Sequence, residues 1–74
     1  MKFDEYKNQD TKITLNNGFI FYGRICQIVS EDALIFQTGV AHHGRKHLEY
    51  QHASMINVNG NDIKDIKVYE PDIN

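Results

Sequence analysis

The fold is decided by residues 12–23, which read KITLNNGFIFYG. Ile13 and Leu15 alternate with polar residues, as expected for a strand with one buried face. The Asn-Asn-Gly step that follows favours a tight turn, because asparagine and glycine tolerate positive φ. A run rich in aromatic and β-branched residues then extends from Phe19 to Val29, interrupted by Gly23. A glycine inside a long strand is typical of a bend or a bulge, so this stretch predicts one strongly curved strand.

Further short strands are predicted along the rest of the chain, at residues 33–38, 47–52 and 55–58. Residues 63–69 form either a sixth strand or a tail. Short strands at this spacing are typical of a small, strongly bent antiparallel barrel. The first ten residues predict a short helix with Phe3 and Tyr6 on one side. The expected organisation is therefore a helix over 1–10, a barrel over 11–58 and a C-terminal extension over 59–74.

Composition excludes several classes of protein. The chain has 74 residues and a formal net charge of -2, so its total charge does not indicate a strongly basic nucleic-acid binder. Cys26 is its only cysteine, which excludes an internal disulfide and a zinc site of the Cys-pair type. The sequence shows neither a membrane-spanning apolar run nor a secretory leader pattern, and we expect a cytoplasmic protein.

Two stretches carry a resemblance to the Sm family. Residues 12–18 followed by Gly23 resemble the opening Sm motif, in which a strand, a turn and a bent second strand pivot on a glycine. Residues 44–53, GRKHLEYQHA, resemble the second Sm motif of the bacterial Hfq branch, where a strand ends in Tyr-Lys-His-Ala. The resemblance covers residues 11–58. It implies an all-β, small and strongly bent five-stranded Sm-like (SH3-like) barrel with a short N-terminal helix.

The same resemblance implies a function. Sm-like protomers join edge strand to edge strand, the fourth of one copy with the fifth of the next, into rings of six or seven. Such rings bind single-stranded RNA that is rich in uridine or adenine. We therefore expect a homo-oligomeric ring, a hexamer or heptamer, that binds RNA in the manner of an RNA chaperone.

A second register of the resemblance stays open. Residues 58–63, VNGNDI, resemble the Arg-Gly loop of the archaeal and eukaryotic Sm branch, with Asn59 in the arginine position. In that register the fourth strand is 54–58 and the fifth is 63–69. The Hfq-like register, with its fourth strand at 47–52, is preferred because it matches more side chains. Two departures remain: Gln51 replaces a lysine, and the turn at 30–33 has the acid but no aromatic residue.

The candidate RNA-binding residues lie in the segment from His42 to His52, which is locally basic in an otherwise acidic chain. Cations there would meet phosphates, while histidine and tyrosine would contact bases. A solvated hairpin loop is the alternative interpretation of this segment. The predicted RNA-binding residues are Tyr50, Gln51, His52, Arg45, Lys46 and His47.

Other chemistry is not indicated. The chain has no glycine-rich phosphate loop and no nucleophile elbow, so we do not expect an enzyme. Cys26 is expected to be a small buried hydrophobic residue rather than a nucleophile. The histidines lack the spacing of metal ligands, and no metal or cofactor is expected. The alternative function is an Sm-like barrel that serves as a protein-interaction or scaffold module without binding RNA.

Overall fold

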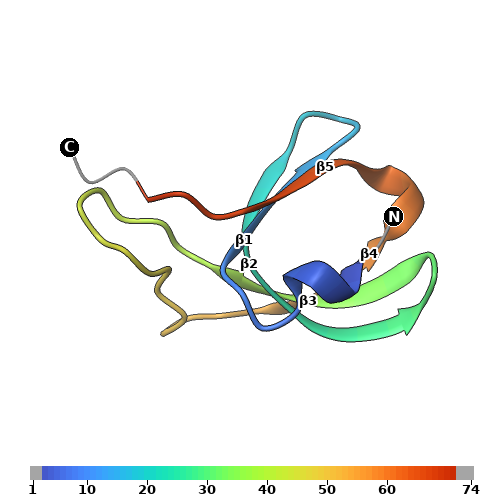
Figure 1. Cartoon of the computed structure of the whole chain (residues 1–74), viewed down its shortest axis with the longest axis horizontal. Coiled ribbons are helices and arrows are strands. Elements are labelled where there is room, and N and C mark those ends of the chain that lie inside the picture. Colours follow the sequence, from blue (N-terminus) through green and yellow to red (C-terminus); the bar gives the residue numbers. More distant parts are fainter. Residues whose placement is uncertain (1–2, 72–74) are drawn as a thin grey trace.

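The computed structural model describes residues 3–71 and consists of one five-stranded antiparallel sheet with two short 3₁₀ helices (Figure 1). The predicted all-β class is therefore confirmed. The strand order in the sheet is β4-β3-β2-β1-β5, so β4 and β5 are its two edges. The sheet is open, because its two edge strands are not paired with each other. In chain order the elements are η1 (Phe3–Tyr6), β1 (Thr11–Leu15), β2 (Ile20–Ser30), β3 (Ala33–Gly39), β4 (Met55–Asn59), η2 (Gly60–Asp62) and β5 (Ile63–Val68).

The β1–β2 hairpin follows the predicted pattern. The Leu15 N–H donates to the Phe19 carbonyl at 2.8 Å, and Gly18 takes a φ of 92° inside the turn. The Asn17 side chain accepts from the Phe19 N–H at 3.0 Å. A residue with a Cβ would be strained at Gly18, so the turn needs the glycine that the sequence supplies.

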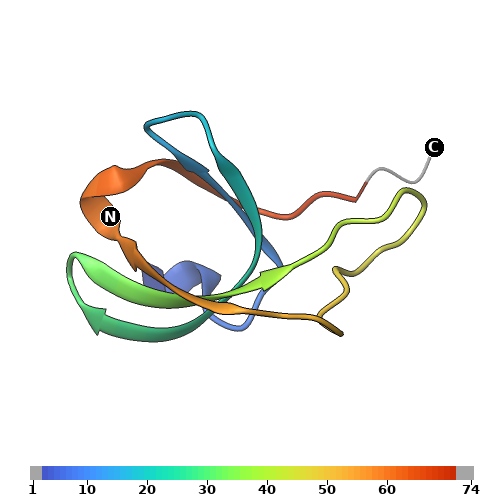
Figure 2. The ribbon, with the colours of Figure 1, turned by 180° about the vertical axis from the view of Figure 1, so that it is seen from behind.

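The long strand β2 is the central strand of the curved sheet. Gly23 lies opposite Thr11 on β1 and opposite Thr38 on β3. A Cβ at this position would overlap the carbonyl oxygen of Gln37 and come within 2.8 Å of the Phe36 ring. The glycine therefore lets the β2 and β3 backbones approach closely. Figure 2 shows the curvature of the sheet.

The core lies on the concave side of this sheet, and η1 and all five strands contribute to it. Phe36, Ile13, Ile25 and Leu34 are almost completely buried. Each side chain of this size contributes about 1.5–3 kcal/mol when it leaves water. The complete cluster is Phe3, Ile13, Ile25, Leu34, Phe36, Val58, Ile63 and Ile66.

The N-terminal helix is shorter than predicted. It is a 3₁₀ helix of four residues, which buries Phe3 and partly buries Tyr6, as the spacing predicted. Asn8 has a positive φ of 67°, which ends the helical path before β1. Residues 1–2 of the predicted helix and residues 72–74 of the predicted extension lie outside the described part of the chain.

The predicted strand at 47–52 is wrong, whereas the strands predicted at 55–58 and, as one of two options, at 63–69 are confirmed as β4 and β5. Residues 47–52 belong to a loop, in which only Glu49 forms a β-bridge, to Val40. The Leu48 N–H donates to the Asp10 carboxylate rather than to a neighbouring strand, and a turn follows Tyr50. The fourth strand is β4 and the fifth is β5, which pairs with β1. These positions agree with the strands of the second register.

Cys26 also differs from expectation, because it is exposed. Ile25 next to it points into the core, so alternation along β2 turns Cys26 to the outer face. Its Sγ lies 3.6 Å from the Met55 Sδ on β4. Among residues 3–71, neither helix has the length and apolar character needed to cross a membrane.

Candidate functional site

All six predicted RNA-binding residues lie in one long loop between β3 and β4, residues 40–54, which we call the basic loop. It projects from one end of the sheet (Figure 1). Two contacts close its base. Val40 and Glu49 exchange backbone hydrogen bonds of 2.9 Å, and the Thr38 N–H donates to the Ser54 carbonyl at 2.8 Å.

A single carboxylate, Asp10, fixes this loop to the sheet. Asp10 Oδ1 accepts from Arg24 Nε at 2.8 Å and from the Tyr50 hydroxyl at 2.8 Å. Its Oδ2 accepts from the Leu48 N–H at 3.1 Å. The Asp10 side chain is only 10% exposed, so these contacts form largely out of water. We call this group of four residues the Asp10 anchor.

The hydrogen bonds of the anchor favour the charged form of Asp10 and the neutral form of Tyr50. Burial by itself raises the pKa of Asp10, but the hydrogen bonds from Arg24, Leu48 and Tyr50 outweigh it, and this pKa lies below its ordinary value. The pKa of Tyr50 is raised, first by burial and then by its hydrogen bond to Asp10. Arg24 also lies over the Tyr50 ring, 5.2 Å from its centroid. Tyr50 therefore stays a neutral hydrogen-bond donor, and its hydrogen bond to Asp10 holds the loop against the sheet.

Three of the predicted RNA-binding residues lie together on the exposed part of the loop. Arg45, Lys46 and His47 are exposed and line a shallow cavity of about 350 Å³. His47 is 84% exposed at its side chain, although its Nδ1 comes within 3.7 Å of Asp10 Oδ2. Glu49, the acidic residue of the loop, lies beside His42, with Glu49 Oε2 2.9 Å from His42 Nε2. The arrangement can hold a phosphate against two permanent positive charges.

Gln51 and His52 occupy a different part of the loop. They are exposed in the turn that follows Tyr50, where the Ala53 N–H donates to the Tyr50 carbonyl at 3.1 Å. Neither residue lines the cavity that Arg45, Lys46 and His47 line. The structure therefore brings Arg45, Lys46 and His47 together, buries part of Tyr50, and leaves Gln51 and His52 on the adjacent surface.

Sequence reasoning missed Asp10 and Arg24 as the residues that position this loop. Asp10 meets Tyr50 across 40 residues and Arg24 across 14. No local pattern marks a carboxylate whose partners lie so far along the chain. Only its lone position directly before the first strand distinguishes it in the sequence.

The β2–β3 turn and η2 lie at the end of the sheet opposite the basic loop (Figure 1), and a second hollow lies between them. The Gly60 N–H donates to the Asp32 carbonyl at 2.6 Å and joins these two turns. Asn59 caps η2, because its side chain accepts from the Asn61 N–H at 2.9 Å. The hollow has a volume of about 380 Å³ and is lined by Val29, Asp32, Ala33, Leu34, Asn57, Val58, Asn59 and Asp62.

Comparison of the chain with protein-family models, with curated proteins and with solved structures found no match.

Proposed function

We propose that this chain is an Sm-like single-stranded RNA-binding protein that acts as a homo-oligomeric ring. One observation carries the proposal: β4 and β5 are the two edges of a strongly bent five-stranded sheet. The Sm resemblance calls for pairing of the fourth strand of one copy with the fifth strand of the next. Such pairing would complete the backbone hydrogen bonds of both edges at once.

The side chains on the two edges support self-association. Met55 on β4 is 62% exposed and Val68 on β5 is 47% exposed. A domain of 74 residues has a small core, and oligomerisation is a common way to stabilise one. A ring of paired edges would remove both apolar side chains from water.

The basic loop is the proposed RNA contact. Arg45 and Lys46 would contact phosphates, and His52 would contact a base or a ribose. Tyr50 acts through its hydrogen bond to Asp10, which holds the loop in place. A ring would repeat this loop in every subunit, and the repeats would raise the avidity for a long RNA strand.

The strand positions also agree with the second Sm register, in which Asn59 takes the arginine position. The hollow between Asp32 and Asn59 lies at the matching turns. The turn after β2 has no aromatic residue on which a base could stack, and Asn59 carries no charge. We therefore assign the principal RNA contact to the basic loop and not to these turns.

The test combines RNA binding with mass measurement. Fluorescent oligo-U and oligo-A are titrated with the full chain at low and at moderate salt, and the mass is measured by light scattering. We expect micromolar or tighter binding that weakens steeply with salt, because phosphate contacts release counterions. We also expect the mass of a hexamer or heptamer. A ring that binds neither RNA would refute the RNA function and assign the fold to protein partners, while a monomer would refute the ring.

A further inference from the structure

The outer face of β2, β1 and β5 carries a row of aromatic and basic side chains that borders the start of the basic loop. Lys12 on β1 lies directly opposite Tyr22 on β2 and directly opposite Lys67 on β5. Residues in direct register point to the same side of a sheet. The next residues, Ile13 and Ile66, are buried in the core, so the row lies on the outer surface.

A second tyrosine extends this row. The Tyr69 ring packs edge-on against the Tyr22 ring, with centroids 5.6 Å apart and planes at 84°. The Tyr69 N–H donates to the Asp10 carbonyl at 2.8 Å, which holds the chain in place just after β5. Both tyrosines are half-buried. We call Tyr22, Lys12, Lys67 and Tyr69 the tyrosine–lysine face.

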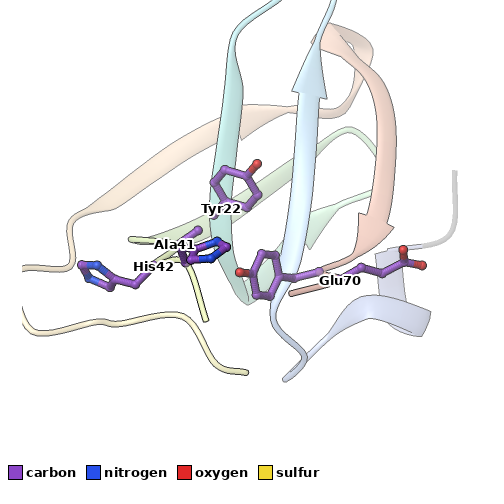
Figure 3. Close-up of a pocket in the computed structure, with 6 residues that line it drawn as sticks. Tyr22, Ala41, His42 and Glu70 are labelled. Carbon is purple, nitrogen blue, oxygen red and sulfur yellow. The ribbon is translucent and has the colours of Figure 1, made fainter. Parts of the chain in front are cut away.

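Two hollows meet at the tyrosine pair. One has a volume of about 240 Å³ and adds His42 and His43 to the two tyrosines (Figure 3). The other has a volume of about 220 Å³ and adds Lys12 and Lys67. The same tyrosine pair thus lines both hollows, one of which also has two histidines and the other two lysines. Glu70 also lines both hollows, but its carboxylate points away from Tyr22 (Figure 3).

The lysine pair points to an anionic ligand. Like charges directly opposite each other on neighbouring strands destabilise a sheet. The nearby acid Asp65 lies 3.8 Å from the Lys67 Nζ, and this exposed ion pair is weak. A phosphate between Lys12 and Lys67 would relieve their repulsion, and the adjoining rings offer faces and edges for a base.

We propose that the tyrosine–lysine face binds one nucleotide of single-stranded RNA. Its base stacks against the tyrosine pair beside His42, and its phosphate lies between Lys12 and Lys67. This inference rests on the proposed RNA-binding function and adds a contact surface on the sheet, beside the start of the basic loop. Because stacking accepts every base, this face contributes affinity without sequence preference.

The experiment compares variants of the full chain in the oligo-U and oligo-A titration at two salt concentrations. Lys67→Gln should weaken binding at low salt and reduce the slope of log K against log salt by about one. It should leave the melting temperature unchanged or raise it, because it removes the lysine repulsion. Lys64→Gln removes an exposed charge from the same strand, outside the face, and is the matched control. It should bind RNA as the wild-type chain does.

Tyr69→Leu tests the stacking contact. We expect about tenfold weaker binding at both salt concentrations, since stacking does not depend on counterions. Tyr69→Phe keeps the ring and should restore affinity relative to Tyr69→Leu. Thermal melting of each variant checks that it is folded, and Lys67→Gln provides a test that does not depend on the packing of Tyr69.

The outcomes separate this inference from the function on which it rests. Wild-type binding that Lys67→Gln and Tyr69→Leu leave unchanged would overturn the tyrosine–lysine face and keep the RNA function. Absence of RNA binding by the wild-type chain would overturn both. A parallel titration with AMP and UMP distinguishes a site for free nucleotides. Binding of either as tight as that of the oligonucleotides would refute the RNA assignment.

Discussion

The Tyr50 hydroxyl donates a 2.8 Å hydrogen bond to Asp10 Oδ1, although the two residues are 40 positions apart. The same carboxylate accepts from Arg24 on β2, so it connects the start of β1, the middle of the sheet and the basic loop. Beyond the backbone contacts at its base, the position of this loop therefore depends on one largely buried charge. Loss of the Asp10 charge should therefore lower the free energy of unfolding, because Asp10 supports the loop and does not itself contact a ligand.

Asp10→Asn should destabilise the fold by about 1–3 kcal/mol at neutral pH, because the partners of a buried carboxylate lose its charge. The pKa of Asp10 is lowered in the folded chain, so its contribution is present above its unfolded pKa of about 4. The contribution is lost as the pH falls through the folded pKa. Denaturant unfolding from pH 7 to pH 2 should show the gap between variant and wild type closing below about pH 4.

Asp4→Asn, which neutralises an exposed carboxylate of η1, is the control for that series. It should track the wild-type curve at every pH. An Asp10→Asn deficit that stayed constant down to pH 2 would mean that the charge of Asp10 does not support the anchor.

His52→Ala should weaken RNA binding several-fold without altering thermal stability, because His52 is exposed on the turn after Tyr50. Fluorescence anisotropy with oligo-U and oligo-A measures the first effect, and circular dichroism melting measures the second. Tyr50→Phe is the comparison, since it removes the hydrogen bond to Asp10 and should lower stability by about 0.5–1.5 kcal/mol. Normal binding by His52→Ala would remove His52 from the site.

Gly23→Ala should destabilise the chain by at least about 3 kcal/mol, because the new Cβ overlaps the Gln37 carbonyl. In a small domain that loss is a large part of the total stability. Gly44→Ala in the basic loop meets open space and only the strain of its positive φ, 79°, so its cost should be about 1–2 kcal/mol. Urea unfolding of both variants provides the comparison, and equal losses would contradict a packing role for Gly23.

If the chain forms the proposed ring, Met55→Glu and Val68→Glu should each shift it towards monomers, because charges on edge strands oppose pairing between edges. Light scattering over a concentration series measures the mass of each variant. Val29→Glu changes an exposed apolar residue on the central strand β2, which is not an edge strand, and should leave the oligomer intact. A ring that survives both edge substitutions would show that the subunits meet through another surface.

Strands β1 to β4 could be predicted because their information is local, and β5 matches one of the two interpretations of residues 63–69. Ile13 and Leu15 alternate with polar residues, Gly18 closes the turn, and Gly23 marks the curve of the second strand. Each signal acts within a few residues, and strand boundaries at β1, β2 and β3 follow it closely.

The same local pattern predicted a strand at residues 47–52, where the structure has a loop. Leu48 and Tyr50 alternate with polar residues as they would in a strand, and Leu48 is indeed buried. Leu48 and Tyr50 are held against the sheet by the Asp10 anchor rather than by pairing with a neighbouring strand. The Leu48 N–H and the Tyr50 hydroxyl both donate to Asp10. The alternation in 47–52 therefore predicted correctly that Leu48 is buried, but it predicted wrongly that a strand is the reason.

The sequence by itself determined an all-β chain with a glycine-dependent bend and one basic segment, since residue type and short spacing fix these properties. The tertiary structure alone decided that β4 and β5 form the edges and that Asp10 holds the basic loop. It alone placed Lys12 beside Tyr22 and Lys67. Each of these relationships joins residues far apart in the chain, and strand register, which depends on the packing of the whole sheet, brings them together.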